Sequence, residues 1–232
     1  MTSDRSAARD PGDGVLGRGT GAIYWFLVVG LLLVLTTLPG TLPLMLLDRS
    51  TSNIPLVALC LVPAGPALSA GLFAMRDRYR AESLTPMASF LRGYRLNVVE
   101  VLKLWVPGLA VLTIIGITLA NLEYAGVPGG YGVVLVVLAV LFSVWALNAL
   151  VITSFFALRT RDVARLAVYY MARTPLVALG LLAMLVVAAG IVYFTFDVVL
   201  LLVSPILVWL LLRTCDAMVS HVEANFIARG GS

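Results

Sequence analysis

The residues that could do chemistry in this chain are few, and they lie far apart in the sequence. The one histidine, His221, stands near Asp216 and Glu223, and histidine with carboxylates is a grouping that general acid–base catalysis uses. All three lie at the C-terminal end of the last apolar run, where a solvated helix face is the simpler interpretation. Cys60 and Cys215 both fall within apolar runs, which indicates packing rather than a metal cluster or a disulfide. We therefore predict no catalytic, cofactor-binding or metal-ligating residues, and a protein that is not an enzyme.

Polar residues inside the apolar runs are a second place to look for chemistry. A proton or ion relay inside a membrane normally uses a charged side chain, and the middles of the apolar runs hold none. Asn148 is the main polar candidate there, and we expect it to join two helices by a hydrogen bond worth about 0.6 to 2 kcal/mol. Glu100 and Lys103 are three positions apart, and we expect them to pair and to anchor a helix at the membrane interface.

The elements that would position these side chains are long apolar helices. The chain has 232 residues, 61% apolar and only 12% charged, whereas soluble domains carry about 25% charged residues. A bilayer core roughly 30 Å thick needs about 20 apolar helical residues. We therefore predict an all-α membrane bundle of six transmembrane helices within residues 23–227. The predicted spans are residues 24–47, 54–75, 98–121, 133–158, 175–196 and 198–218.

The basic residues predict the orientation of the spans. Of the 16 Lys and Arg, all but Arg49 fall in the N-terminal segment, near the C-terminus, or around the loops after spans two and four. By the positive-inside rule these segments face the cytoplasm, so both termini are predicted inside. Residues 1–22 are expected to be a disordered cytoplasmic tail, and residues 228–232 a flexible C-terminus. The net charge of +4 fits topology and anionic lipids better than nucleic acid.

Both basic loops are predicted to contain an amphipathic elbow helix lying along the cytoplasmic leaflet. In the first loop, Thr85 can cap a helix that starts at Pro86, and apolar residues follow at helical spacing. In the second, Thr160 can cap a helix whose apolar stripe runs from Val163 to Tyr170. The alternative is that each helix is an extension of the next span. The elbow residues are Phe90, Arg92, Tyr94, Arg95, Asn97, Arg161 and Arg165.

Prolines and small residues shape the first two spans. Pro39 and Pro43 in span one, and Pro63 and Pro66 in span two, remove backbone donors, so we predict kinks. The alternative is that they break the helices and frame a substrate site, as in some transporters. Small side chains spaced four apart favour close helix approach. They predict a face for helix packing or for a partner, made of Gly65, Pro66, Ala67, Ser69, Ala70 and Gly71.

Span two and its elbow also carry a recognisable motif. A Gly-Pro-Ala turn at residues 65–67 is followed by a small-residue helix that ends in a basic cluster. A Phe-x-x-x-aromatic-x-x-Asn pattern then occurs at Phe90, Tyr94 and Asn97. This stretch resembles the bacterial YesL-like family, also described as domain of unknown function 624, and the resemblance covers roughly residues 24–158. The long, proline-rich link between spans one and two departs from the family's usual pattern.

The resemblance implies a function by association only, because the family has no established activity. Its members look like companions of carbohydrate ABC importers, so it implies a bacterial inner-membrane protein with an accessory role in sugar uptake. The expected partners are the lipid bilayer and either an ABC permease, another membrane protein or a second copy of the chain. No cofactor is expected. The alternative functions are a small transporter or channel and, with less support from the residues, a membrane enzyme acting on lipids.

Overall fold

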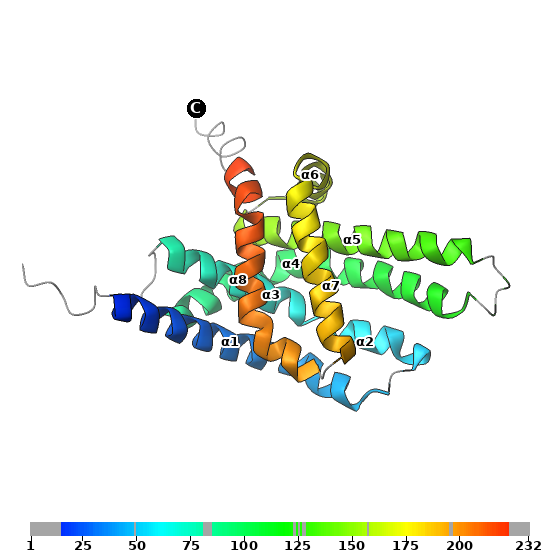
Figure 1. Ribbon diagram of the computed structural model, residues 1–232, viewed down its shortest axis with the longest axis horizontal. Coiled ribbons are helices and arrows are strands. Elements are labelled where there is room, and N and C mark those ends of the chain that lie inside the picture. The colour runs from blue at the N-terminus through cyan, green and yellow to red at the C-terminus, as the bar shows by residue number, and fades with distance from the viewer. Residues whose placement is uncertain are drawn as a thin grey trace, which may run out of the picture.

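The computed structural model describes residues 15–48, 50–80, 85–122, 124, 126, 129–156, 158–194 and 197–222. This part of the chain is helical throughout its regular structure (Figure 1), as the sequence predicts. The helices are α1 (Val15–Leu46), η2 (Thr51–Asn53), α2 (Ile54–Cys60), α3 (Ala64–Arg80), α4 (Pro86–Ala120), α5 (Gly130–Phe155), α6 (Thr160–Arg173), α7 (Pro175–Phe194) and α8 (Asp197–Val222).

Five of the described helices are long and apolar enough to cross a membrane, and the count rises to six if α2 and α3 form one bent span. The structure therefore supports a multi-pass helical membrane protein. The five helical stretches that meet these requirements are Thr20–Leu46, Pro86–Ala120, Gly130–Phe155, Pro175–Phe194 and Val199–Ser220.

The N-terminal boundary differs from the prediction. Residues 15–22, predicted as part of a disordered tail, are the first turns of α1. The physical reason is that extending a helix costs far less than starting one, and nothing between Val15 and the apolar run stops it. Residues 1–14 and the predicted flexible C-terminus at 228–232 lie outside the described residues.

Span two is not one straight helix. The two pieces α2 and α3 meet at 40° across residues 61–63, because Pro63 has no amide hydrogen and the chain makes tight turns there. The indole N–H of Trp105 in α4 donates to the carbonyl oxygen of Leu61 at 3.0 Å and so satisfies one backbone group at the break. By contrast, α1 continues through Pro39 and Pro43 to Leu46.

Helix α3 is the centre of the bundle. It contacts α1, α4, α5 and α8, and Ala67, Ala70 and Ala74 along it are fully buried. The indole N–H of Trp25 in α1 donates to the carbonyl oxygen of Ala74 at 3.2 Å. Small side chains on α3 thus let its four neighbours approach closely.

The prediction of a separate first elbow helix is wrong. Residues 86–97 are the first turns of α4, which continues unbroken to Ala120. The one residue in this stretch that could loosen the helix, Gly93, is instead pressed against α3: a Cβ atom there would lie 2.6 Å from Cβ of Phe73. Packing on α3 holds the segment in line with span three, which is the extension alternative.

The second elbow is a separate helix, α6. Its predicted apolar stripe is buried at Val163, Ala167 and Tyr170, and the indole N–H of Trp145 in α5 donates to the carbonyl oxygen of Ala164 at 3.1 Å. The helix ends before Pro175, as expected for a residue that precedes proline. The stripe therefore covers α5, while its placement along a leaflet stays a prediction.

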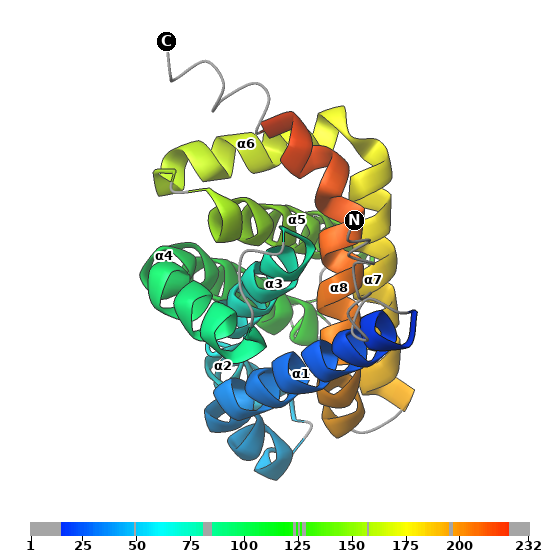
Figure 2. The ribbon, with the colours of Figure 1, turned by 90° about the vertical axis from the view of Figure 1, so that its left-hand side faces the viewer.

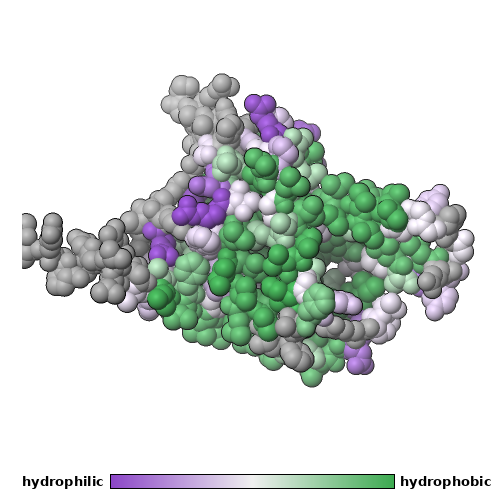
Figure 3. All heavy atoms as spheres, viewed as in Figure 1, coloured by the Kyte–Doolittle hydropathy of each residue, from purple (hydrophilic) through white to green (hydrophobic). Residues whose placement is uncertain are grey.

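The helices fall into two groups. In Figures 1 and 2, α7 and α8 form a hairpin that crosses the direction of α1, α4 and α5 steeply. Figure 3 shows hydrophilic residues near the ends of α3 and α8 and around α6, and a broad apolar surface over α1, α5, α7 and α8. This separation of a polar end from an apolar flank is the pattern expected of a protein in a bilayer.

Candidate functional site

The six small residues predicted as a packing or partner face all lie inside the bundle. Ala67, Ser69 and Ala70 are fully inaccessible, and Gly65, Pro66 and Gly71 are buried as well. A Cβ atom on Gly65 would lie 2.5 Å from Cγ of Trp105, so the indole ring rests directly on the backbone. Helices of the same chain occupy this face, and an outside partner must bind elsewhere.

A polar cluster joins α3, α4 and α5. The side-chain amide of Asn97 donates to the carbonyl oxygen of Ser154 at 3.0 Å and to Oγ of Ser69 at 3.4 Å. The hydroxyl of Ser154 donates to the carbonyl oxygen of Leu150 at 2.7 Å, and Oγ of Ser154 lies 2.8 Å from Oγ of Ser69, within hydrogen-bond distance. We call Ser69, Asn97 and Ser154 the polar node. The sequence analysis placed Asn97 in an elbow and Ser69 on the small face, and it missed Ser154.

Asn97 also has a capping role. Ser154 is the second-last residue of α5, and the last four carbonyls of a helix have no partner within it. The amide of Leu158, which could have continued the helix, donates to Phe156 instead. Asn97 therefore supplies from α4 a donor that α5 itself lacks.

Asn148 is buried, as expected of a polar residue in the middle of a span, and the hydrogen bond predicted to join it to another helix stays a prediction. The residue is 1% exposed, and Oδ1 has no hydrogen-bond partner among the described residues. The polar node joins its helices near the end of α5, not at Asn148. Val151 and Ile152, which follow Asn148 in α5, belong to the apolar core.

Arginines and aromatic rings meet at one end of the bundle, which we call the basic end. The guanidinium of Arg76 lies 4.6 Å from the ring centre of Phe155, and that of Arg78 lies 5.8 Å from the ring of Phe26. Phe26 makes an edge contact with Trp209 at 6.4 Å. Arg213, on the predicted sixth span, lies 5.7 Å from the Trp209 ring. These cation–π contacts hold charged groups beside apolar spans.

The predicted elbow residues divide into an inner and an outer set. Phe90 is fully buried and Tyr94 packs against the core, whereas the four elbow arginines are exposed. The same two helices carry exposed apolar and aromatic side chains, and α4 and α6 contact each other. We call the exposed set the elbow surface; it consists of Met87, Leu91, Arg92 and Arg95 of α4 and Arg161, Arg165, Val168 and Tyr169 of α6.

Two other polar features belong to this end. Glu100 and Lys103 form the ion pair that the sequence predicts, with Nζ and Oε1 2.6 Å apart. Burial raises the pKa of Tyr170, and Tyr169 adds to the rise while Arg173 opposes it. Tyr170 lies on the buried face of α6, and its hydroxyl therefore stays neutral at physiological pH.

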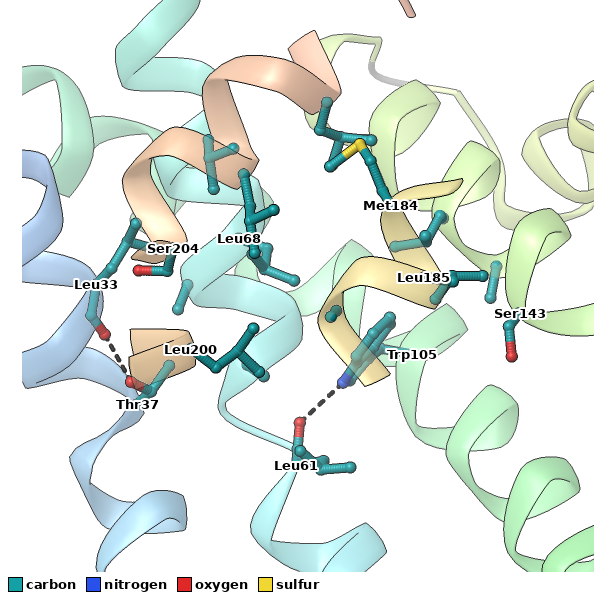
Figure 4. Close-up of a pocket in the computed structure, with 18 of the residues that line it drawn as sticks. Leu33, Thr37, Leu61, Leu68, Trp105, Ser143, Met184, Leu185, Leu200 and Ser204 are labelled. Atoms are coloured by element: carbon teal, nitrogen blue, oxygen red, sulfur yellow. Dashed lines mark hydrogen bonds between the residues drawn. The ribbon is translucent and has the colours of Figure 1, made fainter. Parts of the chain in front are cut away.

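A cavity of about 430 Å³ lies where α2 and α3 separate. Its walls come from α1, α3, α4, α5, α7 and α8, and Figure 4 shows Leu68, Trp105, Leu185 and Leu200 around it. The described residues contain no group of three His, Cys, Asp or Glu side chains that could hold a metal ion. The cavity is open on one side, and almost all of its lining is hydrocarbon.

The fold and its sites define a class, the multi-pass helical membrane proteins. No protein-family model, no curated protein and no solved structure matches the chain. The similarity to the YesL-like family therefore depends on the motif of span two and its elbow.

Proposed function

We propose that the protein is a non-enzymatic, multi-pass protein of a bacterial inner membrane that acts as an accessory subunit of a carbohydrate ABC uptake system. In this proposal both termini and the basic end face the cytoplasm, and the elbow surface binds the partner. The observation that carries the proposal is the make-up of that surface. The choice of partner follows from the YesL-like motif.

The elbow surface has the composition of a protein interface. Met87 is 54% exposed, Val168 is 57% exposed and Tyr169 is 50% exposed, and exposed arginines stand beside them. Tyrosine, methionine and arginine are enriched in protein interfaces, whereas lysine and acidic residues are depleted. Tyr169 lies edge-on to Tyr170 at 5.3 Å, and the guanidinium of Arg173 lies 5.9 Å from its ring. These contacts hold the ring in place as an anchor for a partner.

Affinity purification in a mild detergent tests the proposal. The tagged wild-type chain should bring down a stoichiometric membrane partner, identified by mass spectrometry as an ABC permease. Tyr169→Ala should lower the recovery of that partner about tenfold or more, because truncating an aromatic anchor typically costs 2 kcal/mol or more. A chain that always purifies alone contradicts the proposal.

Tyr193→Ala is the matched control. Tyr193, in α7, is 75% exposed and makes the same kind of edge contact, with Phe194 at 5.0 Å, but it lies outside the elbow surface. Its replacement should leave partner recovery at the wild-type level. Equal losses in the two variants would mean that the elbow surface is not the binding site.

A second candidate function is transport by the chain itself. The 40° break between α2 and α3 lies beside the 430 Å³ cavity, and broken helices line substrate sites in several transporter folds. Counterflow in proteoliposomes distinguishes the two functions. Flux that depends on an added sugar or ion would favour transport, and its absence across sugars and ions would remove this alternative.

A further inference from the structure

The cavity beside the broken span has the dimensions of a ligand pocket. Its volume of about 430 Å³ falls within the range of roughly 300 to 1,000 Å³ that small-molecule pockets occupy. It is also about three times the size of an engineered apolar cavity of ~150 Å³ that takes up benzene. The space is therefore too large to be a simple packing defect.

The lining presents almost nothing but hydrocarbon. None of the 22 residues around the cavity is charged. The hydroxyls among them are engaged with their own helices: Thr37 donates to the carbonyl oxygen of Leu33 at 2.7 Å, and Ser204 donates to that of Leu201 at 2.6 Å. The indole N–H of Trp105 is engaged with Leu61.

This lining selects against polar occupants. A buried water needs two to four polar partners, and an ion or a sugar would lose its hydration with no replacement. A long aliphatic chain gives up no hydration on entering such a space, because it exchanges one apolar environment for another and gains dispersion contacts with the lining.

The position of the cavity indicates where that chain comes from. Its walls belong to the apolar lengths of α4, α5, α7 and α8, all of which are long and apolar enough to span a membrane. Figure 3 shows the surface hollowed beside α7, between α2 and the outer halves of α4 and α5. On α7, Val186 and Val187 lie in the sequence between the lining residues Leu185 and Ala188, and both are exposed. The hollow thus faces the bilayer, where phospholipid chains are the abundant apolar molecules.

We propose that the cavity binds one acyl chain of a membrane phospholipid, which enters sideways from the bilayer beside α7. The phospholipid headgroup stays at the membrane interface, and the chain fills the space between the α7–α8 hairpin and α3. This binding requires neither a protein partner nor transport, so it is independent of the function proposed above.

Photo-crosslinking with a phospholipid that carries a diazirine in its acyl chain tests the proposal. The full-length protein is reconstituted in vesicles of that lipid, irradiated, and mapped by mass spectrometry. Wild type should show adducts on cavity residues such as Leu109 and Leu201, together with adducts on outward-facing residues such as Leu179. The outward adducts report the surrounding bilayer and serve as the internal reference.

A cavity-filling variant makes the test specific. Gly108 lines the cavity, and a Cβ atom there meets only Cε1 of Phe142, at 3.8 Å. Gly108→Leu therefore has room for its side chain, and leucine favours a helix more than glycine does. The matched control is Gly190→Leu in α7, where a Cβ atom meets nothing within 4 Å and which does not line the cavity. A second filler, Ala188→Phe, narrows the cavity from α7.

The expected result is a loss of cavity adducts, by about tenfold, in Gly108→Leu and Ala188→Phe, with unchanged outward adducts and unchanged cavity adducts in Gly190→Leu. Adducts confined to the outward faces of wild type would overturn the proposal. So would cavity adducts that survive both fillers, or that disappear equally in the control. Labelling of the cavity by a diazirine fatty acid but not by the phospholipid would also overturn it, because the occupant would then have a different source.

Discussion

The polar node gives a direct test of how the bundle is joined, through the replacement Asn97→Leu. Leucine has the same number of side-chain heavy atoms as asparagine, branched at the same carbon, but it cannot donate a hydrogen bond. The variant removes the 3.0 Å bond to the carbonyl oxygen of Ser154 and the 3.4 Å bond to Oγ of Ser69. The hydroxyl link between Ser154 and Ser69 at 2.8 Å remains.

The size of the effect follows from which group is left without a partner. Hydrogen bonds between membrane helices are worth about 0.6 kcal/mol on average and up to about 1.7. An acceptor left buried and unsatisfied costs about 1 to 3 kcal/mol, and the Ser154 carbonyl lies at a helix end where no amide of α5 can replace Asn97. We therefore expect Asn97→Leu to lower the free energy of unfolding by about 1 to 2 kcal/mol.

Reversible unfolding by SDS in mixed micelles, followed by circular dichroism, measures this difference. Asn121→Leu is the matched control, because Asn121 directly follows the last residue of the same helix, is exposed, and its side-chain amide donates only to the carbonyl oxygen of Ile117 one turn back. It should change stability by a few tenths of a kcal/mol at most. Ser154→Ala should fall between the two, since the carbonyl cap survives. Equal effects of the two asparagine variants would refute the capping role of Asn97.

Two further predictions concern packing and topology. Gly93→Ala should destabilise the protein by about 1 to 3 kcal/mol, because the new Cβ would overlap with Phe73. Gly190→Ala, with open space around the new Cβ, should leave stability unchanged in the same SDS titration. A Gly93→Ala protein as stable as wild type would show that α3 and α4 are not pressed together at this point. In a background without the two native cysteines, Tyr124→Cys should react with a membrane-impermeant maleimide that is added outside cells. Arg165→Cys should react only after the membrane is opened. The reverse pattern of labelling would invert the proposed orientation.

The spans were predictable from sequence because their signal is local. Each needs only a run of apolar residues long enough for the bilayer, and the second elbow helix was predictable because α6 has its own apolar stripe and a proline soon after its end. The cap predicted at Thr160 is wrong, because Arg159 occupies the N-cap position and no side chain caps the helix. The buried stripe at Val163, Ala167 and Tyr170 follows directly from helical spacing. The break at Pro63 was anticipated as a kink, and its 40° angle depends on how α2 packs against α4.

The remaining features depend on tertiary contacts that a single sequence does not display. Whether residues 86–97 turn away from span three or continue it is decided by Phe73 against Gly93. The hydrogen bonds of Asn97 could not be predicted either, because its acceptor, the carbonyl oxygen of Ser154, becomes free only where α5 ends. The small residues of α3 predicted a face for helix packing or for a partner, and only the fold shows that the chain's own helices fill this face.

The broken second span has a consequence for biosynthesis. Residues 51–60 form a helical piece only about 15 Å long, half the thickness of a bilayer core of roughly 30 Å, so it cannot enter the membrane as an independent unit. Its exposed carbonyl at Leu61 is satisfied by Trp105, a residue translated more than forty positions later. We expect the first hairpin to stay at the insertion machinery until α4 emerges from the ribosome and completes it.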